Sequence, residues 1–339
     1  MYGGVIMVNV YDSLIGPYEV SIDITNKCNL RCLHCYNQSG ENIYIDDELT
    51  DDELLVLVRE IVSMKPVNVC FSGGEPLLRK ELLYKLISII SENSIMTSMV
   101  SNGLLIDSKV AELLKRAGLS RIQISLDGIK SSHDMLRNMQ GAFYKVIDCL
   151  QILKDINLPT YIGFVPTKWN IDEFNEIVDI ALEFGVVSVR TQYFMPTGRG
   201  ESNKEIIPTA KEYRRLLRDL YSRKYKLIKD KSNLIIEWDD PIQYFFDVCG
   251  EKSLYPQLHI KANGNVTNTP YLPITFGNIK STTFEQIIEE GALNQINNSQ
   301  FVEICKAITC IEDMVFSNLN LPKNFIEEDI MIQMGREVI

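Results

Sequence analysis

The sequence lacks any apolar run close to the roughly 20 residues that a membrane-spanning helix needs. Residues 1–11 also lack the basic region of a signal peptide, and no proline-, glycine- or serine-rich tract indicates low complexity. These absences predict a folded protein of the cytoplasm that does not bind to membranes.

An excess of basic charge is also missing. The chain carries 34 basic and 45 acidic residues, a formal net charge of −11 at pH 7. An acidic surface repels a nucleic-acid backbone or an anionic membrane on average. We therefore expect neither to be the main partner.

Cysteine is scarce for a disulfide-stabilised secreted protein, with eight residues in 339. The spacing of these cysteines is therefore informative about metal binding. Cys70 and Cys149 fall in a predicted strand and a predicted helix, so we interpret them as core thiols.

Short runs rich in β-branched residues alternate with longer stretches of helical periodicity, which is typical of repeated β-α units around a parallel sheet. Thr50–Glu53 fits a capping box, and Gly118 and Gly185 are placed to end helices. We predict an α/β fold, a partial (β/α)6 TIM-type barrel. The expected strands are residues 18–25, 67–71, 96–100, 121–125, 160–165 and 186–192, and helices begin near Asp51, Arg79, Asp107, Gly141 and Ile171.

The pattern changes after the sixth strand. A turn-rich break at Pro196–Gly200 precedes a charged amphipathic helix at about 208–227 and a strand at about 234–237, and beyond Asp240 the β-α alternation ends. We expect a core of residues 1–200, a linking helix and strand at 201–240, and a smaller α+β domain at 241–339.

Three cysteines, Cys28, Cys32 and Cys35, follow the first predicted strand within eight residues. In a loop, their thiols can converge on one metal centre. A four-iron cluster held by three thiolates keeps one iron open for an outside ligand. Structural zinc with His34 as a fourth ligand is the alternative, but the spacing fits tetrahedral zinc poorly.

Cys28-x-x-x-Cys32-x-x-Cys35 followed by the aromatic Tyr36 resembles the signature of the radical S-adenosylmethionine superfamily, and other matching segments follow in order over roughly residues 18–200. The resemblance implies a [4Fe–4S] cluster whose open iron binds S-adenosylmethionine. One electron, from a donor such as flavodoxin or ferredoxin, then releases methionine and a 5′-deoxyadenosyl radical that takes a hydrogen atom from the substrate.

Ser72–Pro76 resembles the methionine-amine site of this family, with glycines that allow close approach and Glu75 as an acceptor. The strand ends near Asn102 and Asp127 would contact ribose or carboxylate groups, Arg137 would pair with a carboxylate, and Phe164 would stack near adenine. Ordinary turns, an exposed arginine and core packing are the alternatives. The resulting cofactor-binding candidates are Tyr36, Gly73, Gly74, Glu75, Ser101, Asn102, Ser125, Asp127, Arg137 and Phe164. We assign no catalytic base, and His133 does not qualify from sequence alone.

Cys249, Gly264 and the run at 276–280 resemble the opening of the SPASM and twitch extensions that hold auxiliary iron–sulfur clusters. Thr269 stands where those extensions have a second cysteine, and a hydroxyl is a poor substitute for a thiolate. Cys305 and Cys310 could join Cys249 in a second cluster. A twitch-like fold that lost its cluster is an equally good interpretation.

The segment His133–Arg137 and the twitch-like tail resemble peptide-modifying members, so we expect a peptide or protein substrate. The short stretch before Cys28 leaves no room for a leader-binding domain, so recognition would need a separate partner or a surface groove. The second hypothesis is a small-molecule substrate, such as a tetrapyrrole or an aminoglycoside-type sugar. Arg190 and Arg199 would then hold substrate carboxylates. The turn at Pro196–Gly200 resembles one that follows the barrel in haem-pathway members. A non-catalytic iron–sulfur redox protein is the third.

Overall fold

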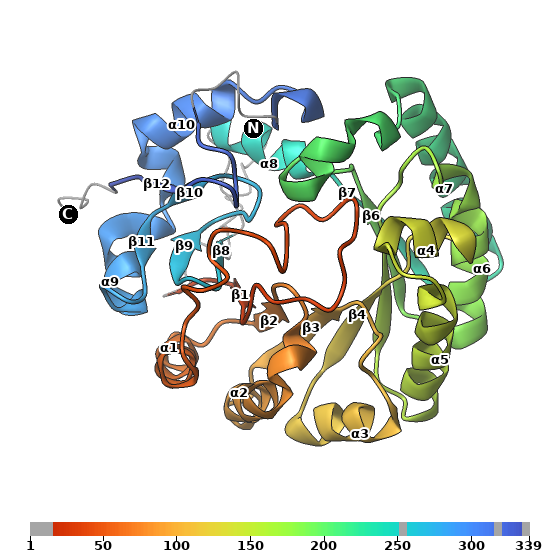
Figure 1. Cartoon of the computed structure of the whole chain (residues 1–339), viewed down its shortest axis with the longest axis horizontal. Coiled ribbons are helices and arrows are strands. Elements are labelled where there is room, and N and C mark those ends of the chain that lie inside the picture. Colours follow the sequence, from red (N-terminus) through yellow and green to blue (C-terminus); the bar gives the residue numbers. More distant parts are fainter. Residues whose placement is uncertain (1–15, 251–255, 315–320, 334–339) are drawn as a thin grey trace, which may run out of the picture.

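The computed structural model describes residues 16–250, 256–314 and 321–333; the N-terminal stretch inspected for a signal peptide lies outside them. The chain forms a ten-stranded sheet in the order β11-β9-β8-β1-β2-β3-β4-β5-β6-β7. Helices surround the curved sheet on its outer side (Figure 1). No helix in the described ranges is long and apolar enough to cross a membrane.

Six parallel strands in sequence order form the centre of the sheet and confirm the predicted β-α units, with boundaries within two residues of those expected. The sheet does not close, so the architecture is a partial barrel of the TIM type. The strands are β1 Glu19–Asp23, β2 Asn68–Ser72, β3 Met96–Ser101, β4 Arg121–Ser125, β5 Thr160–Phe164 and β6 Ser188–Gln192.

The helices that follow these strands begin and end largely as the caps predict. Thr50 and Glu53 form the capping box, and Gly118 and Gly185 end their helices in the left-handed conformation. The short helix α4 is an addition to the expected set. The bounds are α1 Asp51–Ser63, η2 Pro76–Arg79, α2 Lys80–Glu92, α3 Ser108–Ala117, α4 Ser131–Arg137, α5 Ala142–Asp155, η3 Ile171–Glu173 and α6 Phe174–Phe184.

The two faces of the central strands differ sharply. Outward residues such as Ile22 and Phe71 are fully buried in the hydrophobic core. Inward residues are mostly polar, including Ser21 and Gln123, and line an internal cavity. A TIM barrel is normally filled by apolar side chains, so this interior is instead suited to a ligand. Cys70 faces the cavity rather than the core, which corrects one prediction.

Strands from the last third of the chain extend the sheet at both edges. η4 Gly198–Ile206 and α7 Ala210–Lys229 lead to β7 Ile235–Asp239, which pairs with β6 and confirms the predicted helix and strand. After α8 Pro241–Cys249, β8 Gln257–Ile260 pairs with β1 and turns through Gly264 into β9 Asn265–Thr267. Because the predicted core, linker and C-terminal part share one sheet, the three-part division stays a prediction.

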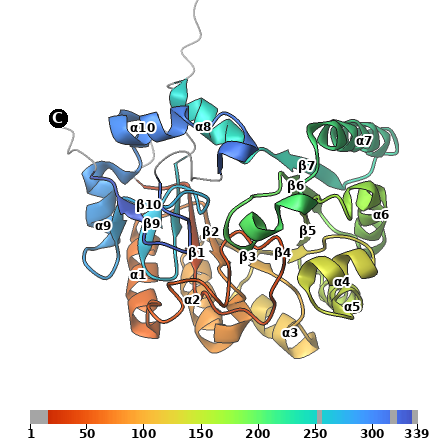
Figure 2. The same ribbon diagram turned by 45° about the horizontal axis from the view of Figure 1, so that its top comes forward.

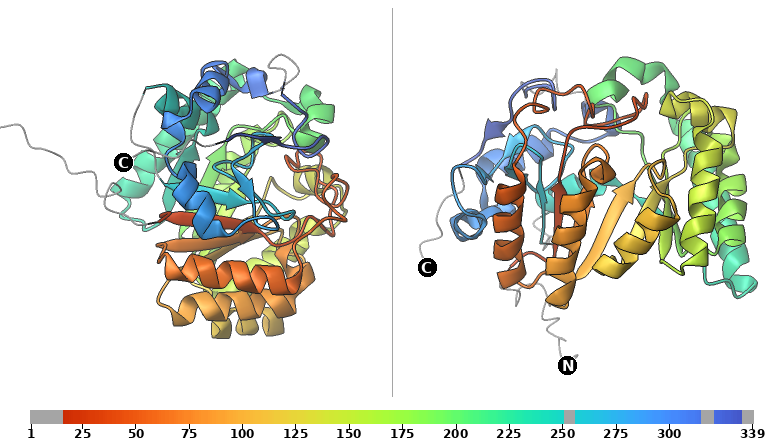
Figure 3. Two further views of the ribbon diagram at one scale, coloured as in Figure 1. Left: turned by 90° about the vertical axis from the view of Figure 1, so that its left-hand side faces the viewer. Right: turned by 60° about the horizontal axis from the view of Figure 1, so that its bottom comes forward.

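The remaining C-terminal elements lie beside the segment that joins β1 to α1. Strands β10 and β12 form a separate parallel pair. Figures 2 and 3 show the blue C-terminal region and the green region after β6 on either side of the red segment between β1 and α1, which lies over the ends of the central strands. These elements are β10 Ile274–Thr275, β11 Gly277–Asn278, α9 Phe284–Ile287, η5 Ile288–Ala292, η6 Gln295–Asn297, α10 Ser299–Lys306, η7 Ile311–Met314 and β12 Ile330–Met331.

Candidate functional site

The three cysteines expected to bind iron lie in the loop between β1 and α1, which we call the cysteine loop (residues 24–49). Cys28, Cys32 and Cys35 all line one cavity of about 790 Å³. Burial raises the pKa of Cys28 to about 11 and also raises that of Cys32. Metal binding therefore has to displace protons from these thiols.

Nitrogen donors face each of the three sulfur atoms. The backbone N–H of Leu30 donates to Cys28 Sγ at 3.4 Å, that of Ser39 donates to Cys35 Sγ at 3.4 Å, and Arg137 donates to Cys32 Sγ at 3.6 Å. Hydrogen bonds to cluster sulfurs stabilise the thiolate form and help to set a cluster's reduction potential.

Asp127 connects the end of β4 to the cysteine loop. Its carboxylate lies 2.5 Å from Arg137 and 3.0 Å from Nε2 of His34. In the sequence, His34 stands between Cys32 and Cys35. Burial alone would raise the pKa of Asp127, but the Arg137 guanidinium and His34 hold it below its ordinary value. Arg137 is buried, so the exposed-loop alternative is wrong. His34 also belongs to this site, whereas its position in the sequence suggested only a fourth ligand for zinc.

The two glycines after β2 allow the cysteine loop to pass close to the sheet. Gly73 has φ +124°, and a Cβ there would lie 2.3 Å from the carbonyl oxygen of Thr25; at Gly74 it would lie 2.0 Å from that of Lys27. The backbone N–H of Gly74 donates to Thr25 O at 2.7 Å. Both glycines line the cavity.

Glu75 lies behind this glycine pair and not among the residues that line the cavity. Its buried carboxylate accepts hydrogen bonds from the backbone N–H of Asn102 at 2.9 Å and the hydroxyl of Ser101 at 3.0 Å. Burial raises the pKa of Glu75 to about 7. This geometry connects the turns after β2 and β3, while contact with a methionine amine stays a prediction.

Three more of the predicted polar residues, Ser101, Asn102 and Ser125, line the cavity at the strand ends. Asn102 Nδ2 also donates to Oδ1 of Asn29 in the cysteine loop at 2.8 Å. The structure thus brings together residues from β3 and β4 that the sequence placed at separate turns.

Phe164 and His133 belong to the packing around the site. The Phe164 ring is 1% exposed and contacts Phe174 at 6.0 Å between centroids. Phe164 also lines the cavity, so a place near adenine stays a prediction. His133 Nδ1 accepts from the backbone N–H of Asp127, and burial lowers the pKa of His133 to about 4. The ring therefore helps to hold the turn after β4 through its Nδ1.

Arg199 contacts the cysteine loop from the other side. Its guanidinium donates to the carbonyls of Cys32 at 3.0 Å and Ser39 at 3.1 Å and pairs with Glu41 at 2.8 Å. Gly198 lets the chain approach, because a Cβ there would lie 2.5 Å from the carbonyl oxygen of Tyr36. These contacts use Nε and Nη1 of Arg199 to hold the loop, while a role in holding substrate carboxylates stays a prediction.

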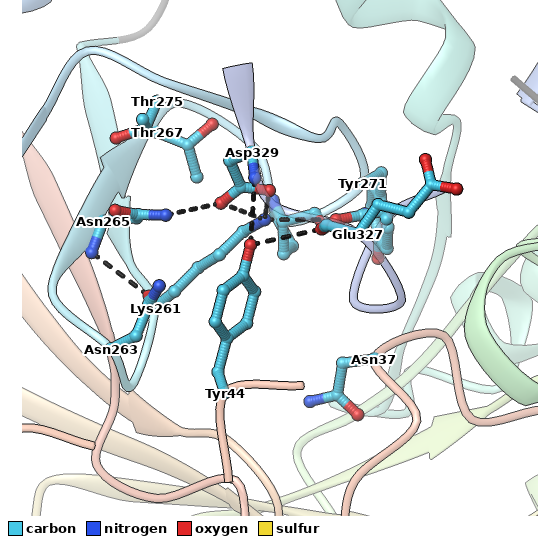
Figure 4. Close-up of polar contacts among 12 residues, drawn as sticks. Asn37, Tyr44, Lys261, Asn263, Asn265, Thr267, Tyr271, Thr275, Glu327 and Asp329 are labelled. Carbon is cyan, nitrogen blue, oxygen red and sulfur yellow. Dashed lines mark hydrogen bonds and ion pairs between the residues drawn. The ribbon is translucent and has the colours of Figure 1, made fainter. Parts of the chain in front are cut away.

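Tyr36 and Tyr44 connect the cysteine loop to the C-terminal segment 321–333, which we call the strap. The Tyr36 ring contacts Phe325 at 6.2 Å between centroids, and Tyr44 accepts from the backbone N–H of Asp329 at 3.0 Å. Figure 4 shows Asp329 paired with Lys261 of the β8–β9 turn, at 2.8 Å. Both charged side chains are buried, at 1% and 0% exposure.

The C-terminal cysteines do not resemble the first trio. Cys249 and Cys305 approach each other where α8 packs on α10, whereas Cys310 is exposed and faces Asp313. Thr269 lines the cavity. Across the described ranges, no group of three Cys, His, Asp or Glu side chains is gathered around a single-ion site. A four-iron cluster binds each thiolate at a different iron, so this finding does not bear on the first trio.

Unpartnered polar atoms mark the cavity as a ligand site. His34 Nδ1 and Arg137 Nε are buried without a hydrogen-bond partner in the described part of the chain, and both residues line the cavity with the three thiols. Such atoms are rare in folded proteins unless a ligand or water satisfies them. The residues present therefore fit an iron–sulfur cluster with a polar organic ligand beside it.

A partial barrel with a three-cysteine loop at its strand ends defines a class of iron–sulfur enzyme, and comparison with known proteins identifies it. Residues 22–181 match the family model described as Radical SAM superfamily. The chain is 27% identical to the AdoMet-dependent heme synthase of Methanosarcina barkeri, over 81% of this chain and 83% of that protein. It is 25% identical to the sporulation killing factor maturation protein SkfB of Bacillus subtilis, over 87% and 70%.

Solved structures have the same fold. Streptococcus suis SuiB bound to S-adenosylmethionine matches with a TM-score of 0.69 at 17% identity, over 93% of this chain and 76% of that one. The chain belongs to the radical SAM superfamily. It is a radical SAM enzyme that uses a [4Fe–4S] cluster and S-adenosylmethionine.

Proposed function

We propose that this enzyme modifies a peptide or protein, taking a hydrogen atom from a side chain inserted into the cavity. Cys28, Cys32 and Cys35 would hold the cluster. With both cofactors bound, reductive cleavage of S-adenosylmethionine supplies the 5′-deoxyadenosyl radical. Flavodoxin or ferredoxin would donate the electron, in the cytoplasm.

The proposal about the substrate rests on the charged side chains that line the cavity. Every arginine and histidine that lines the cavity already faces an acceptor: Arg137 and His34 face Asp127, Arg190 faces Glu237, His259 faces Asp23, and Arg199 faces Glu41 and loop carbonyls. No arginine or histidine of the wall is therefore left to neutralise an incoming carboxylate.

Two acidic groups of the wall, Asp239 and Asp240, have no cation in ion-pair range among the described residues. Asp239 follows Glu237 on the inward face of β7 and lines the cavity, and burial raises the pKa of its carboxyl group. Burying several substrate carboxylates near this group without partners would be costly. The tetrapyrroles of haem synthesis carry several carboxylates, so the wall favours a neutral or cationic substrate.

Hydrogen-bonding amides and hydroxyls make up much of the remaining wall. Gln192 Nε2 donates to the hydroxyl of Tyr271 at 3.0 Å, and Gln257 and Asn268 also line the cavity. A cavity of this size encloses roughly one drug-sized molecule, and the cluster and S-adenosylmethionine would already occupy much of it. A peptide would thus insert only its reacting part and leave the rest at the surface.

The named relatives divide between the two substrate classes. One is a heme synthase and another matures a sporulation killing factor, while SuiB of Streptococcus suis has also been solved bound to a precursor peptide, SuiA. The cavity charge favours the second class. An amino sugar is a second candidate, since its ammonium groups suit Asp239.

The test uses reconstituted enzyme, dithionite and S-adenosylmethionine with peptides encoded beside its gene, and in parallel with coproporphyrin or an aminoglycoside. We expect 5′-deoxyadenosine to form in each case and only a peptide to change in mass. A mass change confined to the tetrapyrrole would overturn the proposal. The absence of 5′-deoxyadenosine in every mixture would instead indicate an unreactive preparation.

A further inference from the structure

Helix α7 has a charge opposite to that of the rest of the chain. It contains eight basic and two acidic residues, a net charge of +6 within a chain of −11, so the remaining residues carry −17. Arg215 pairs with Asp172 of η3, and Arg223 pairs with Asp179 of α6. The other six basic side chains have no ion-pair partner in the described ranges: Lys211, Arg214, Arg218, Lys224, Lys226 and Lys229.

Large apolar side chains lie among these basic residues on the outer face of α7. Tyr221 is 62% exposed, Tyr225 is 72% exposed and Ile228 is 67% exposed. With Arg214 and Arg218 they recur every three or four residues, so they form one continuous ridge on the helix, which we call the α7 stripe. Tyrosine and arginine are the residue types most enriched at the centres of protein interfaces.

The opposite face of α7 is fixed to the protein. Tyr213, Leu216, Leu220 and Leu227 are buried in the hydrophobic core. Figures 1 and 2 show α7 at the periphery beside α6, away from the cysteine loop. The stripe is therefore a rigid surface separate from the cofactor cavity and needed neither for the fold nor for the cluster.

We propose that the α7 stripe binds an acidic amphipathic polypeptide segment. Such a segment would place apolar side chains against Tyr221, Tyr225 and Ile228 and carboxylates against the unpaired basic residues. At 1.5 Å per residue the stripe is about 21 Å long, which matches a partner helix of about four turns. The proposal does not depend on which substrate enters the cavity.

The distribution of charge over the protein favours a polypeptide segment over a membrane as the partner of α7. An anionic bilayer is flat and would face the strongly acidic remainder of the chain as well as α7. A single peptide segment can lie along α7 and meet only its basic residues. Three apolar side chains on a helix that cannot leave the core also offer little area for insertion into lipid.

The experiment measures fluorescence anisotropy of a labelled synthetic helical peptide of about 15 residues, with leucine on one face and glutamate elsewhere, against the cluster-loaded protein. The matched peptide has serine in place of leucine. Two variants alter the stripe: Tyr221→Ala with Tyr225→Ala, and Arg214→Glu with Arg218→Glu. The controls are Tyr144→Ala, at a tyrosine 59% exposed on α5, and Arg116→Glu, at an exposed arginine on α3.

We expect the leucine peptide to bind, and each stripe pair to weaken the affinity at least about tenfold while the controls change it less than about twofold. Because every altered side chain is exposed, thermal unfolding should be unchanged. Equal binding of the serine peptide, or equal loss in the controls, would overturn the proposal. So would stripe-dependent binding to phosphatidylglycerol vesicles without peptide binding, or a stripe-dependent dimer in sedimentation, which would assign the surface to a membrane or to a second copy.

Discussion

Individual charged side chains around the cysteine loop are used mainly to hold that loop. Arg199 contacts two of its carbonyls, and Arg137 contacts one thiol while paired with Asp127. The sequence identified both arginines, but related Arg199 only to substrate carboxylates, under the small-molecule hypothesis. A lone arginine in a turn does not reveal its acceptors, because those acceptors are backbone carbonyls about 160 residues away along the chain.

Replacing Arg199 by alanine should make the cluster labile. The change removes hydrogen bonds to the carbonyls of Cys32 and Ser39, and charge-assisted bonds of this kind contribute about 1.5 to 3 kcal/mol each. We expect cluster absorbance to bleach several-fold faster with an iron chelator.

Arg190→Ala is the matched control, because Arg190 lines the same cavity but pairs with Glu237 of β7. Its cluster should bleach at the wild-type rate. If both variants bleached equally fast, the loss would reflect cavity charge and not the loop contacts of Arg199.

Glu75 should make stability depend on pH. Its pKa is raised by burial to about 7 in the folded protein, so the folded state binds a proton more tightly than the unfolded state. The stabilisation is complete below the unfolded pKa and is lost as pH rises through about 7. Between about pH 5 and about pH 8, wild-type protein should lose about 1 to 3 kcal/mol more of its unfolding free energy than Glu75→Gln does.

Urea unfolding of both proteins at the two pH values measures this difference. Groups other than Glu75 titrate equally in the two proteins and cancel. A difference that does not change with pH would mean that the Glu75 carboxyl group is not desolvated as the structure indicates.

At the scale of elements, local pattern predicted the β-α units well and the long-range pairings poorly. Caps and periodicity placed the helices and the first six strands, because each depends on neighbouring residues. The Lys261–Asp329 pair joins a β-turn to the strap, which lies 68 residues later. No periodicity specifies such a contact, so the role of the strap emerged only from the fold.

Lys261→Met should destabilise the protein by about 3 to 5 kcal/mol, since it leaves the buried Asp329 carboxylate unpaired. Chemical denaturation measures the loss. Adding Asp329→Leu should restore much of the stability, because the unpaired charge is then gone. A double variant no more stable than Lys261→Met would contradict this account of the pair.

For the whole molecule, the sequence predicted an α/β partial barrel and a trio of cysteines that the structure brings to one cavity, since these follow from repeated units and a compact motif. It left the C-terminal cysteines undecided. The exposure of Cys310, whose thiol faces Asp313, favours a single cluster. The chemistry of Thr269 agrees, because a hydroxyl binds iron–sulfur clusters poorly.

Reconstituted protein should therefore bind about four irons per chain, as one [4Fe–4S] cluster requires. Replacing Cys28, Cys32 and Cys35 together by alanine should remove all of them. Iron and sulfide analysis measures both values. Iron retained by the triple variant, and lost when Cys249 and Cys305 are also replaced, would establish a second cluster.

The sheet order has a consequence for biogenesis. One of the two strands beside β1 is β8, and Arg199 and the strap contact the cysteine loop from other segments that follow it in the sequence. When the three cysteines have just emerged from the ribosome, most of the segments that will surround them have therefore not yet been synthesised. Iron–sulfur assembly factors should therefore load this protein only after translation has passed β8, and truncated nascent chains should remain colourless.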